Sequence, residues 1–418
     1  MKLLQNNLYL YFFMILFSMV LGRFVLESFT VIGTLVAIYL LIRNWHFYFD
    51  ELKENRYLYV ALAFLIPVAI ASIDSLNQSM SLSVLGRFVR YLFIGVIAVA
   101  MVQYQGNEKR LTLITFIAVL FIAIDAIIQW QTNYHILGYD LVIGDRVFGV
   151  FVGKAHLSYF LGTFAPIVFF FLYQKIEEKF SWLRILLAVI TVLILTTAIF
   201  IGGARAGMIS LFVSALLFII YLLYNGKIKH KLRFFGAIAI IAIAGLTIVS
   251  QSEIVQKRFQ STTSAFGTDR FLAQVTSHRT NIWNVGFAEI PNYWINGVGP
   301  RAFDEVYQTY PEEYKIFDYV WQPHLHGLEV LIETGVIGFI PYLLVLLYLF
   351  IRMFTARAGN MWIMMGFVAI MPINSHIGLY EGYWMSLAFS SIMIGLAQAY
   401  QADKINNQRG KVVCNFNK

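Results

Sequence analysis

Long apolar runs recur along the whole chain, and they limit the folds that it can adopt. A bilayer core needs about 20 mostly apolar residues per spanning helix, and the sequence contains twelve runs of about this length. They lie near residues 8–22, 24–42, 57–73, 84–103, 111–130, 156–174, 183–201, 206–224, 233–250, 328–351, 361–378 and 384–400. The longest segment between two runs extends from about Gln251 to Pro323, so one polytopic domain explains the chain better than several soluble domains.

The composition agrees with a membrane protein. Apolar residues make up 59% of the chain and charged residues only 13%, with a mean hydropathy of +0.69, whereas soluble proteins carry about 25% charged residues. No small-residue cleavage site follows the first run, so it is interpreted as a retained helix and not a signal peptide. We therefore predict an all-α polytopic membrane protein with about twelve transmembrane helices: nine in residues 1–250, one large loop domain in 251–327, three helices in 328–400 and a tail in 401–418.

Basic residues in the connections predict the orientation. If the N-terminus is cytoplasmic, the connections on that side hold 19 Lys and Arg residues and the opposite side holds 12, six of them in the long loop. Long loops count little in the positive-inside rule, so both termini are predicted to be cytoplasmic and the loop external. The net charge of +8 follows from this asymmetry and from the anionic inner leaflet, and no nucleic-acid partner is inferred. The single cysteine, Cys414, lies in the tail and predicts neither a disulfide nor a Cys-based metal site.

The external loop is too long and too aromatic for a simple connection. Loops longer than about 15 residues are usually functional or disordered, and the aromatic residues of this one supply material for a small packed core: Trp283, Phe287, Trp294, Phe303, Tyr307, Tyr310, Tyr314 and Trp321. The stretch "SHRTNIWNVGFAEI" predicts an amphipathic helix, and "NGVGPRAFDEVY" predicts a glycine turn that opens into a second helix.

Several arginines are predicted on the external face. Arg205 lies in the short turn "IGGARAGMIS" between two apolar helices, and Arg279 and Arg146 lie in external segments. A lone arginine at such a place can be an interfacial anchor, and Arg87 and Arg90 could equally be solvated helix charges. Because several arginines gather on one face with few acidic partners, and because the guanidinium fork binds phosphate oxygens in pairs, the set favours a phosphorylated ligand.

Two histidines open the helix that follows the loop. His324 and His326 occur in "VWQPHLHGLEVLIETGVIGF", where an external polar segment becomes apolar. Histidine is the side chain best suited to proton transfer near neutral pH, although a histidine at a helix start can also be structural. Residues two apart lie on different sides of a helix, so one catalyst and one bystander are expected. With Glu329 the pair forms no recognised ligand pattern, and no metal site is predicted.

The motifs resemble those of the O-antigen ligase and polymerase family of bacterial envelope proteins. In "PHLHGLEVLIETGVIG" the family spacing is kept by His324, Leu328, Leu331, Glu333, Gly335 and Gly338, with Leu325 where the family usually has Asn. "GGARAG" is similar to the family's arginine-bearing turn, "RTNIW" and "NGVGPRAF" to its Arg-to-Trp segment and Gly-x-Gly-Pro turn, and "RVFGVFVGKAHLSYFL" to its earlier external segment. These matches extend from about residue 146 to 338.

The resemblance implies a GT-C type glycosyltransferase in the bacterial inner membrane that takes a glycan from undecaprenyl diphosphate at the periplasmic face, without a metal or another cofactor. His324 would be the catalytic base, and Arg205 and Arg279 would bind the donor diphosphate. The secondary candidates are His326, Arg146, Arg301 and Glu333, the last either orienting a histidine or capping a helix.

The acceptor distinguishes the members of the family. It would be the lipid A core oligosaccharide in a ligase, which we take as the first hypothesis, another lipid-linked glycan in a polymerase, and a protein in an O-oligosaccharyltransferase. A flippase or exporter is disfavoured because charged residues such as Asp125 are rare within the apolar runs. A non-catalytic scaffold would not explain the convergent Arg and His residues.

Overall fold

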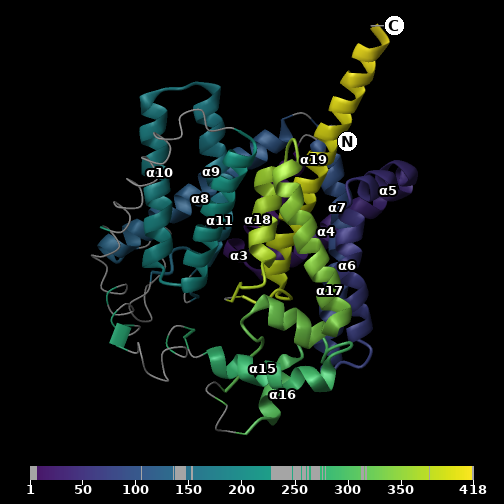
Figure 1. Ribbon diagram of the computed structural model, residues 1–418, viewed down its shortest axis with the longest axis vertical. Coiled ribbons are helices and arrows are strands. Elements are labelled where there is room, and N and C mark those ends of the chain that lie inside the picture. The colour runs from purple at the N-terminus through teal and green to yellow at the C-terminus, as the bar shows by residue number, and fades with distance from the viewer. Residues whose placement is uncertain are drawn as a thin grey trace. The chain divides into compact units, whose positions relative to one another are not determined.

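The computed structural model describes residues 7–104, 106–134, 136, 147–151, 154–226, 247, 256, 260, 263–264, 274, 276–277, 279–311, 315, 318–375 and 377–416, and no β-strand occurs among them. In chain order the helices are α2 (Leu8–Leu16), α3 (Ser18–Leu21), α4 (Arg23–Arg43), α5 (Trp45–Glu54), α6 (Tyr57–Ala71), α7 (Gln78–Val102), α8 (Asn107–Thr132), α9 (Leu157–Glu178), α10 (Trp182–Ile201), α11 (Arg205–Tyr224), α15 (Arg279–Tyr293), α16 (Phe303–Thr309), α17 (His326–Thr355), α18 (Asn360–Ile370) and α19 (Gly382–Phe416) (Figure 1). The chain forms two compact units, unit 1 from Met1–Leu111 with Asn281–Lys418, and unit 2 from Thr112–Thr280.

Several helices are long and apolar enough to cross a membrane. Seven described helices meet this condition by length and composition: α4, α7, α8, α9, α10, α11 and α17. The number rises to eight if α5 and α6, which meet at 83°, form one broken span. The predicted run at 233–250 lies outside the described residues except for residue 247. The chain is therefore a multi-pass helical membrane protein, while the total of twelve spans remains a prediction.

Three of the apolar runs do not form single long helices. The run at 8–22 is divided between α2 and α3, and the run at 57–73 forms the 15-residue helix α6. In the run at 361–378, α18 ends at Ile370, two residues before Pro372. The Asn374 side-chain amide then donates to the carbonyls of Val368 (3.4 Å) and Ala369 (3.1 Å). A local side chain thus replaces the hydrogen bonds that a continuing helix would supply.

Unit 1 is a helical bundle with an aromatic interior. The green α17 packs against α6 and α18, and the yellow α19 packs against α18 and α7 (Figure 1). Phe389 of α19 makes edge-to-face contacts with Phe64 of α6 and Phe88 of α7, with ring centroids 5.1 and 5.2 Å apart. This arrangement of rings is a favourable one, and it joins three helices that are distant in sequence.

Helix α17 is broken near its beginning by a segment of the predicted loop. Gly335 has φ 60° and ψ −164°, which is not a helical conformation. The carbonyls of Ile332 and Glu333 accept hydrogen bonds from the N–H groups of Val298 and Gly299, and the N–H groups of Val336 and Ile337 donate to the carbonyls of Trp294 and Ile295. Residues 294–299 therefore satisfy the backbone groups that the break in α17 leaves open.

Two glycines make this close approach possible. A Cβ on Gly297 would meet the backbone of Glu333 and Thr334, and a Cβ on Gly335 would meet the backbone of Ile295. Both residues also have positive φ, which only glycine adopts without strain. Gly297 was predicted to supply φ freedom to a turn, and the structure confirms that it does.

The aromatic residues of the predicted loop take two different environments. Phe303 and Tyr307 of α16 are buried in a cluster that joins α15 and α16 to Ile332 of α17. Trp294, Trp321 and Phe287 are exposed, although Phe287 was expected on the apolar face of its helix. Tyr314 lies outside the described residues. A small packed core is present, and part of the aromatic surface remains outside it.

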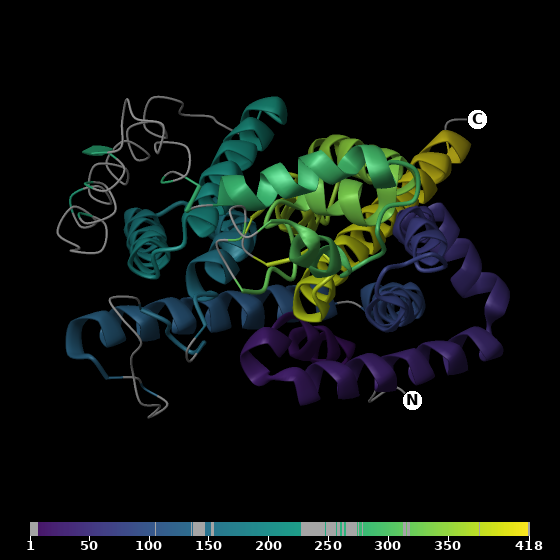
Figure 2. The same cartoon turned by 90° about the horizontal axis from the view of Figure 1, so that it is seen from below.

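The two ends of unit 1 differ in character. At one end α15 and α16 lie nearest the viewer in Figure 2, and they are tied to the beginnings of other helices by bonds such as Asn77 Nδ2 to Glu305 Oε1 (2.8 Å) and Ser81 Oγ to the Pro300 carbonyl (2.8 Å). At the other end Arg352 pairs with Asp403, and Lys404 pairs with Glu51. The first end holds the candidate site.

Unit 2 is built around close contacts between small residues. α9 packs against α10 and α11, and a Cβ on Gly207 would meet the backbone of Ser158. The Ser158 hydroxyl accepts the Ala204 N–H at 3.2 Å, which fixes the turn "GGARAG" against the start of α9. Asp125 of α8 accepts the Ile136 N–H at 3.1 Å, so it has the polar neighbour that its place in an apolar helix requires.

Candidate active site

The connection between α18 and α19 caps the beginning of α17. The N–H groups of His326 and Gly327 donate to the carbonyls of Asn374 (2.9 Å) and Pro372 (3.0 Å). In return, the carboxylate of Glu329, in the first turn, accepts the N–H groups of Leu379 (2.9 Å) and Tyr380 (3.3 Å). The first turn of α17 is therefore held by backbone hydrogen bonds from residues about 50 positions later.

His326 is a structural residue at this position. Its side chain is 1% exposed, and Nε2 lies 2.7 Å from the carbonyl oxygen of Ile377. A carbonyl can only accept, so Nε2 carries the proton and donates it. The buried ring is thus committed to holding the 371–381 connection against α17.

His324 has a different environment. It is half-buried and lies in a bend two residues before α17, with φ 54°. Positive φ is uncommon for residues other than glycine, although histidine tolerates it better than most. The side-chain amide of the buried Gln322 lies 3.2 Å from Nδ1 of His324. Gln322 therefore orients the ring and leaves its opposite edge, with Nε2, away from this hydrogen bond.

Arg301 and Glu333 are joined through the backbone. The Glu333 carboxylate accepts the N–H of Arg301 at 2.6 Å. This bond lies in the turn that precedes α16, while the predicted roles of Glu333, orienting a histidine or capping a helix, stay predictions. The Arg301 guanidinium lies 3.4 Å from Glu381 and 6.0 Å from the centre of the Trp321 ring.

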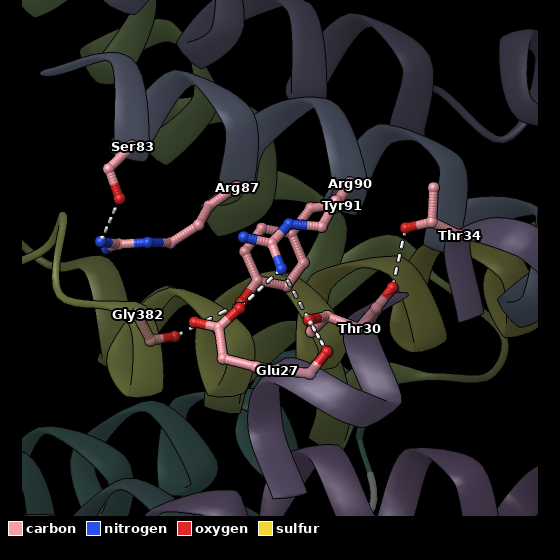
Figure 3. A network of polar contacts seen from close by, with 8 residues as sticks. All are labelled: Glu27, Thr30, Thr34, Ser83, Arg87, Arg90, Tyr91 and Gly382. Atoms are coloured by element: carbon pink, nitrogen blue, oxygen red, sulfur yellow. Dashed lines mark hydrogen bonds and ion pairs between the residues drawn. The ribbon is translucent and has the colours of Figure 1, made fainter. Parts of the chain in front are cut away.

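Arg87 and Arg90 take part in a polar network between α4, α7 and the start of α19 (Figure 3). Arg90 pairs with Glu27 at 2.7 Å, and Arg87 donates to Ser83 Oγ and to the Tyr380 carbonyl, both at 3.0 Å. The two arginines are therefore bound to protein groups that connect helices, and they are more than solvated charges.

In unit 2 the structure links Arg205 to the segment that precedes Arg279. Arg205 is the first residue of α11, and its guanidinium donates to the Gln274 carbonyl at 2.6 Å. Arg279 begins α15 five positions later in the chain than Gln274. Each arginine thus stands at the start of a helix, where the backbone N–H groups also favour anions. Arg146 lies outside the described residues.

His156, just before α9, is a further histidine of unit 2. Burial and, as a smaller effect, the positive charge of Lys154 together lower the pKa of His156 to about 4. This imidazole is therefore neutral at physiological pH and contributes no positive charge to an anion site.

Sequence reasoning missed three residues around His324. Gln322, Trp321 and Glu381 contact the predicted site residues. Trp321 and Gln322 lie within the quoted motif stretch but carry no chemical signature of their own. Glu381 has a weak signal, because it is a single charge in the short polar interval between two apolar runs.

The arrangement in unit 1 can accept a proton and bind polar groups beside it. It offers a half-buried imidazole, an orienting amide and a guanidinium held by a carboxylate. Within the described part of the chain, no three His, Cys, Asp or Glu side chains lie where they could hold one metal ion together.

Residues 190–343 match the family model described as O-antigen ligase, and no curated protein matches the chain. The matched stretch contains Arg205, Arg279, Arg301, His324 and Glu333 and ends within α17. The family resemblance predicted from the motifs is thereby confirmed for residues 190–343, which are similar to the O-antigen ligase family.

Proposed function

We propose that the chain is an O-antigen ligase, a glycosyltransferase that moves a glycan from undecaprenyl diphosphate to the lipid A core oligosaccharide at the periplasmic face of the inner membrane. The family match supports this reaction class. The observation that carries the proposal is the contrast between the two histidines, because His324 is accessible and held by Gln322 while His326 is buried and committed to Ile377.

His324 would act as the general base. Its Nε2 lone pair takes the proton of an acceptor hydroxyl while that oxygen attacks the anomeric carbon of the donor sugar. For this tautomer Nδ1 must carry a proton, and a half-turn of the Gln322 amide presents its oxygen to accept that proton. The bond from the anomeric carbon to the phosphate oxygen breaks from the opposite face, so the linkage is inverted and undecaprenyl diphosphate leaves with the bonding electrons.

Arg205 and Arg279 would stabilise the leaving group. Negative charge grows on the diphosphate as the glycosidic bond breaks, and positioned guanidinium groups stabilise such charge in the transition state. Both side chains stand at helix beginnings, and Arg205 is oriented by its bond to Gln274. The proposal is therefore a metal-independent mechanism in which the arginines supply the positive charge.

The proposed orientation has support within unit 1. Arg352, Arg357 and Lys404 belong to the basic set that predicts the cytoplasmic side, and they pair with Asp403 and Glu51 at the end of unit 1 away from His324. The positive-inside rule then favours a periplasmic His324 and cytoplasmic termini.

Deleting the gene in its host and separating the lipopolysaccharide on a gel tests this function. The ligase proposal expects free core without attached polymer, together with accumulated lipid-linked polymer. Core carrying a single repeat would instead indicate an O-antigen polymerase. Unchanged lipopolysaccharide with loss of glycosylated proteins would indicate a protein O-oligosaccharyltransferase, and either result would overturn the ligase proposal.

A further inference from the structure

Two exposed aromatic rings lie next to each other immediately before His324. Tyr319 is 69% exposed and Trp321 is 51% exposed. Their ring centroids are 6.4 Å apart and their planes differ by 18°. The mechanism described above uses neither ring.

The chain in this segment alternates between the interior and the surface. Val320 and Gln322 are buried, whereas Tyr319 and Trp321, each of which directly precedes one of them, are exposed. The same short segment therefore places Gln322 on His324 and presents two aromatic rings at the surface.

The segment is firmly attached to α16. The Val320 N–H donates to Asp304 Oδ1 at 2.9 Å, and the Gln308 side-chain amide donates to the Asp318 carbonyl at 2.7 Å. Val320 also packs in the cluster with Phe303 and Tyr307. The position of the two rings is thus fixed by the packed core of α15 and α16.

Arg301 supports the Trp321 ring. Its guanidinium lies 6.0 Å from the ring centre, within the range of a cation–π interaction. The ion pair with Glu381 at 3.4 Å and the bond from the Arg301 N–H to Glu333 at 2.6 Å hold the arginine in place. A ligand beside Trp321 would therefore meet an aromatic ring that is held in place, with a guanidinium over one of its faces.

We infer that Tyr319 and Trp321 form a platform that binds a sugar ring of the acceptor glycan beside His324. This inference rests on the proposed transferase function. The face of an aromatic ring is electrostatically negative, and the C–H groups on one face of a pyranose ring are weakly positive and apolar, so the two surfaces are complementary. His324 is proposed to take the proton of the acceptor hydroxyl. Trp321 precedes His324 by three residues, so we assign the sugar that it binds to the acceptor and not to the donor.

Steady-state kinetics of purified Trp321→Ala and Trp321→Phe test the platform. Loss of an aromatic contact should raise the KM for the core acceptor by roughly tenfold, with kcat and the KM for the lipid-linked donor nearly unchanged. Trp321→Phe keeps a ring and should restore most of the affinity. The control is Trp182→Ala, which removes another exposed tryptophan at the start of α10 and should change no constant. An unchanged acceptor KM in Trp321→Ala would overturn the platform.

A binding measurement separates this inference from the proposed reaction. The transfer-deficient His324→Asn protein is titrated with free core oligosaccharide. Its affinity is compared with the affinities of the double variants His324→Asn/Trp321→Phe and His324→Asn/Tyr319→Ala. These double variants remain informative if Trp321→Ala fails to fold. The inference expects binding that weakens most in the Tyr319→Ala protein. Oligosaccharide binding by this platform without transfer in the wild type would contradict only the proposed function.

The competing role for these rings is anchoring at the membrane interface, where Trp and Tyr are enriched. Brominated lipids in nanodiscs quench tryptophans that lie in the bilayer. Quenching that is the same in wild type and Trp321→Phe places Trp321 outside the lipid and agrees with the platform. Quenching that is lost in Trp321→Phe, with no effect of the oligosaccharide, would identify a membrane anchor and overturn the inference.

Discussion

At the residue scale, His324 and His326 differ in the hydrogen bonds that their imidazole nitrogens make. His326 donates its Nε2 proton to Ile377 inside the protein, so it cannot accept one there without losing that bond. His324 is bonded through Nδ1 to Gln322, and its proposed role as base belongs to Nε2. The same contrast indicates which substitution should affect chemistry and which should affect stability.

The substitution His324→Asn removes the imidazole but suits the backbone, because asparagine tolerates the positive φ found here. We expect the transfer rate to fall by about 100-fold or more, the usual scale for general-base catalysis, with the thermal midpoint unchanged. His326→Ala should lower the thermal midpoint and reduce transfer less. Initial rates and thermal unfolding of the purified variants provide the measurement, and full activity in His324→Asn would remove the base from this position.

Substitution of arginine by lysine tests the proposed arginine roles, because it keeps the positive charge and removes the planar guanidinium group. Arg205→Lys and Arg279→Lys should each slow transfer and weaken donor binding, because an ammonium group cannot bind two phosphate oxygens in the planar geometry of a guanidinium. Arg357→Lys, an exposed arginine paired with Asp403, is the matched control and should be neutral. If both site variants transfer glycan as fast as the control, the diphosphate assignment is wrong.

Chelation tests the metal-independent part of the mechanism. Addition of EDTA to the wild type should leave the initial rate unchanged, since positive charge at the diphosphate is assigned to arginine. Inhibition by EDTA that magnesium or zinc reverses would require a metal in place of that assignment.

At the element scale, the break in α17 positions residues of the candidate site. Residues 294–299 supply the hydrogen-bonding groups that α17 lacks around Gly335, and the following residues place Arg301 next to Glu381 and Trp321. The broken helix and the loop are therefore one structural element, and neither has complete backbone hydrogen bonding without the other.

The glycine at the break should be irreplaceable. Gly335→Ala introduces a Cβ against the Ile295 backbone and forces alanine into a positive-φ conformation that essentially only glycine adopts, which alone costs about 1–3 kcal/mol. We expect a clearly lower thermal midpoint and loss of transfer. Gly86→Ala is the control, because its Cβ would meet nothing within 4 Å inside helix α7, and alanine favours a helix. Equal thermal midpoints for the two variants would contradict the account of the break.

Sequence patterns predicted those features that depend on neighbours in the chain. Apolar runs located α7, α9, α10 and α11 to within a few residues, and the glycine-rich turn before α16 was recognised from Gly297 and Gly299. The break at Gly335 was not predicted, since its hydrogen-bond partners lie about 40 residues earlier. The burial of His326 likewise depends on Ile377, which no local pattern reveals.

At the scale of the whole molecule, the positions of the basic residues indicate on which side of the membrane the proposed reaction takes place. Arg352, Arg357 and Lys404, which belong to the basic set, lie at the end of unit 1 opposite His324, consistent with a site on the far side of the membrane from the termini. The stretch at 190–343 that matches the family model includes residues of both compact units.

Labelling of introduced cysteines tests the orientation. In a Cys414→Ser background, which removes the single native cysteine, cysteines replace the exposed Thr309 in α16 and Thr355 at the end of α17. A membrane-impermeant maleimide added to spheroplasts should label position 309 and not position 355, while both should react after detergent is added. The reverse pattern would place the candidate site on the cytoplasmic side.

The most direct test of the proposed function is to identify the product made by the purified protein from a lipid-linked glycan and lipid A core. We expect glycosylated core with an inverted anomeric linkage, formed together with an equal amount of undecaprenyl diphosphate. A retained linkage would contradict direct attack by a hydroxyl activated by His324. Transfer of the glycan to a second lipid-linked glycan, with the core unmodified, would contradict the ligase assignment.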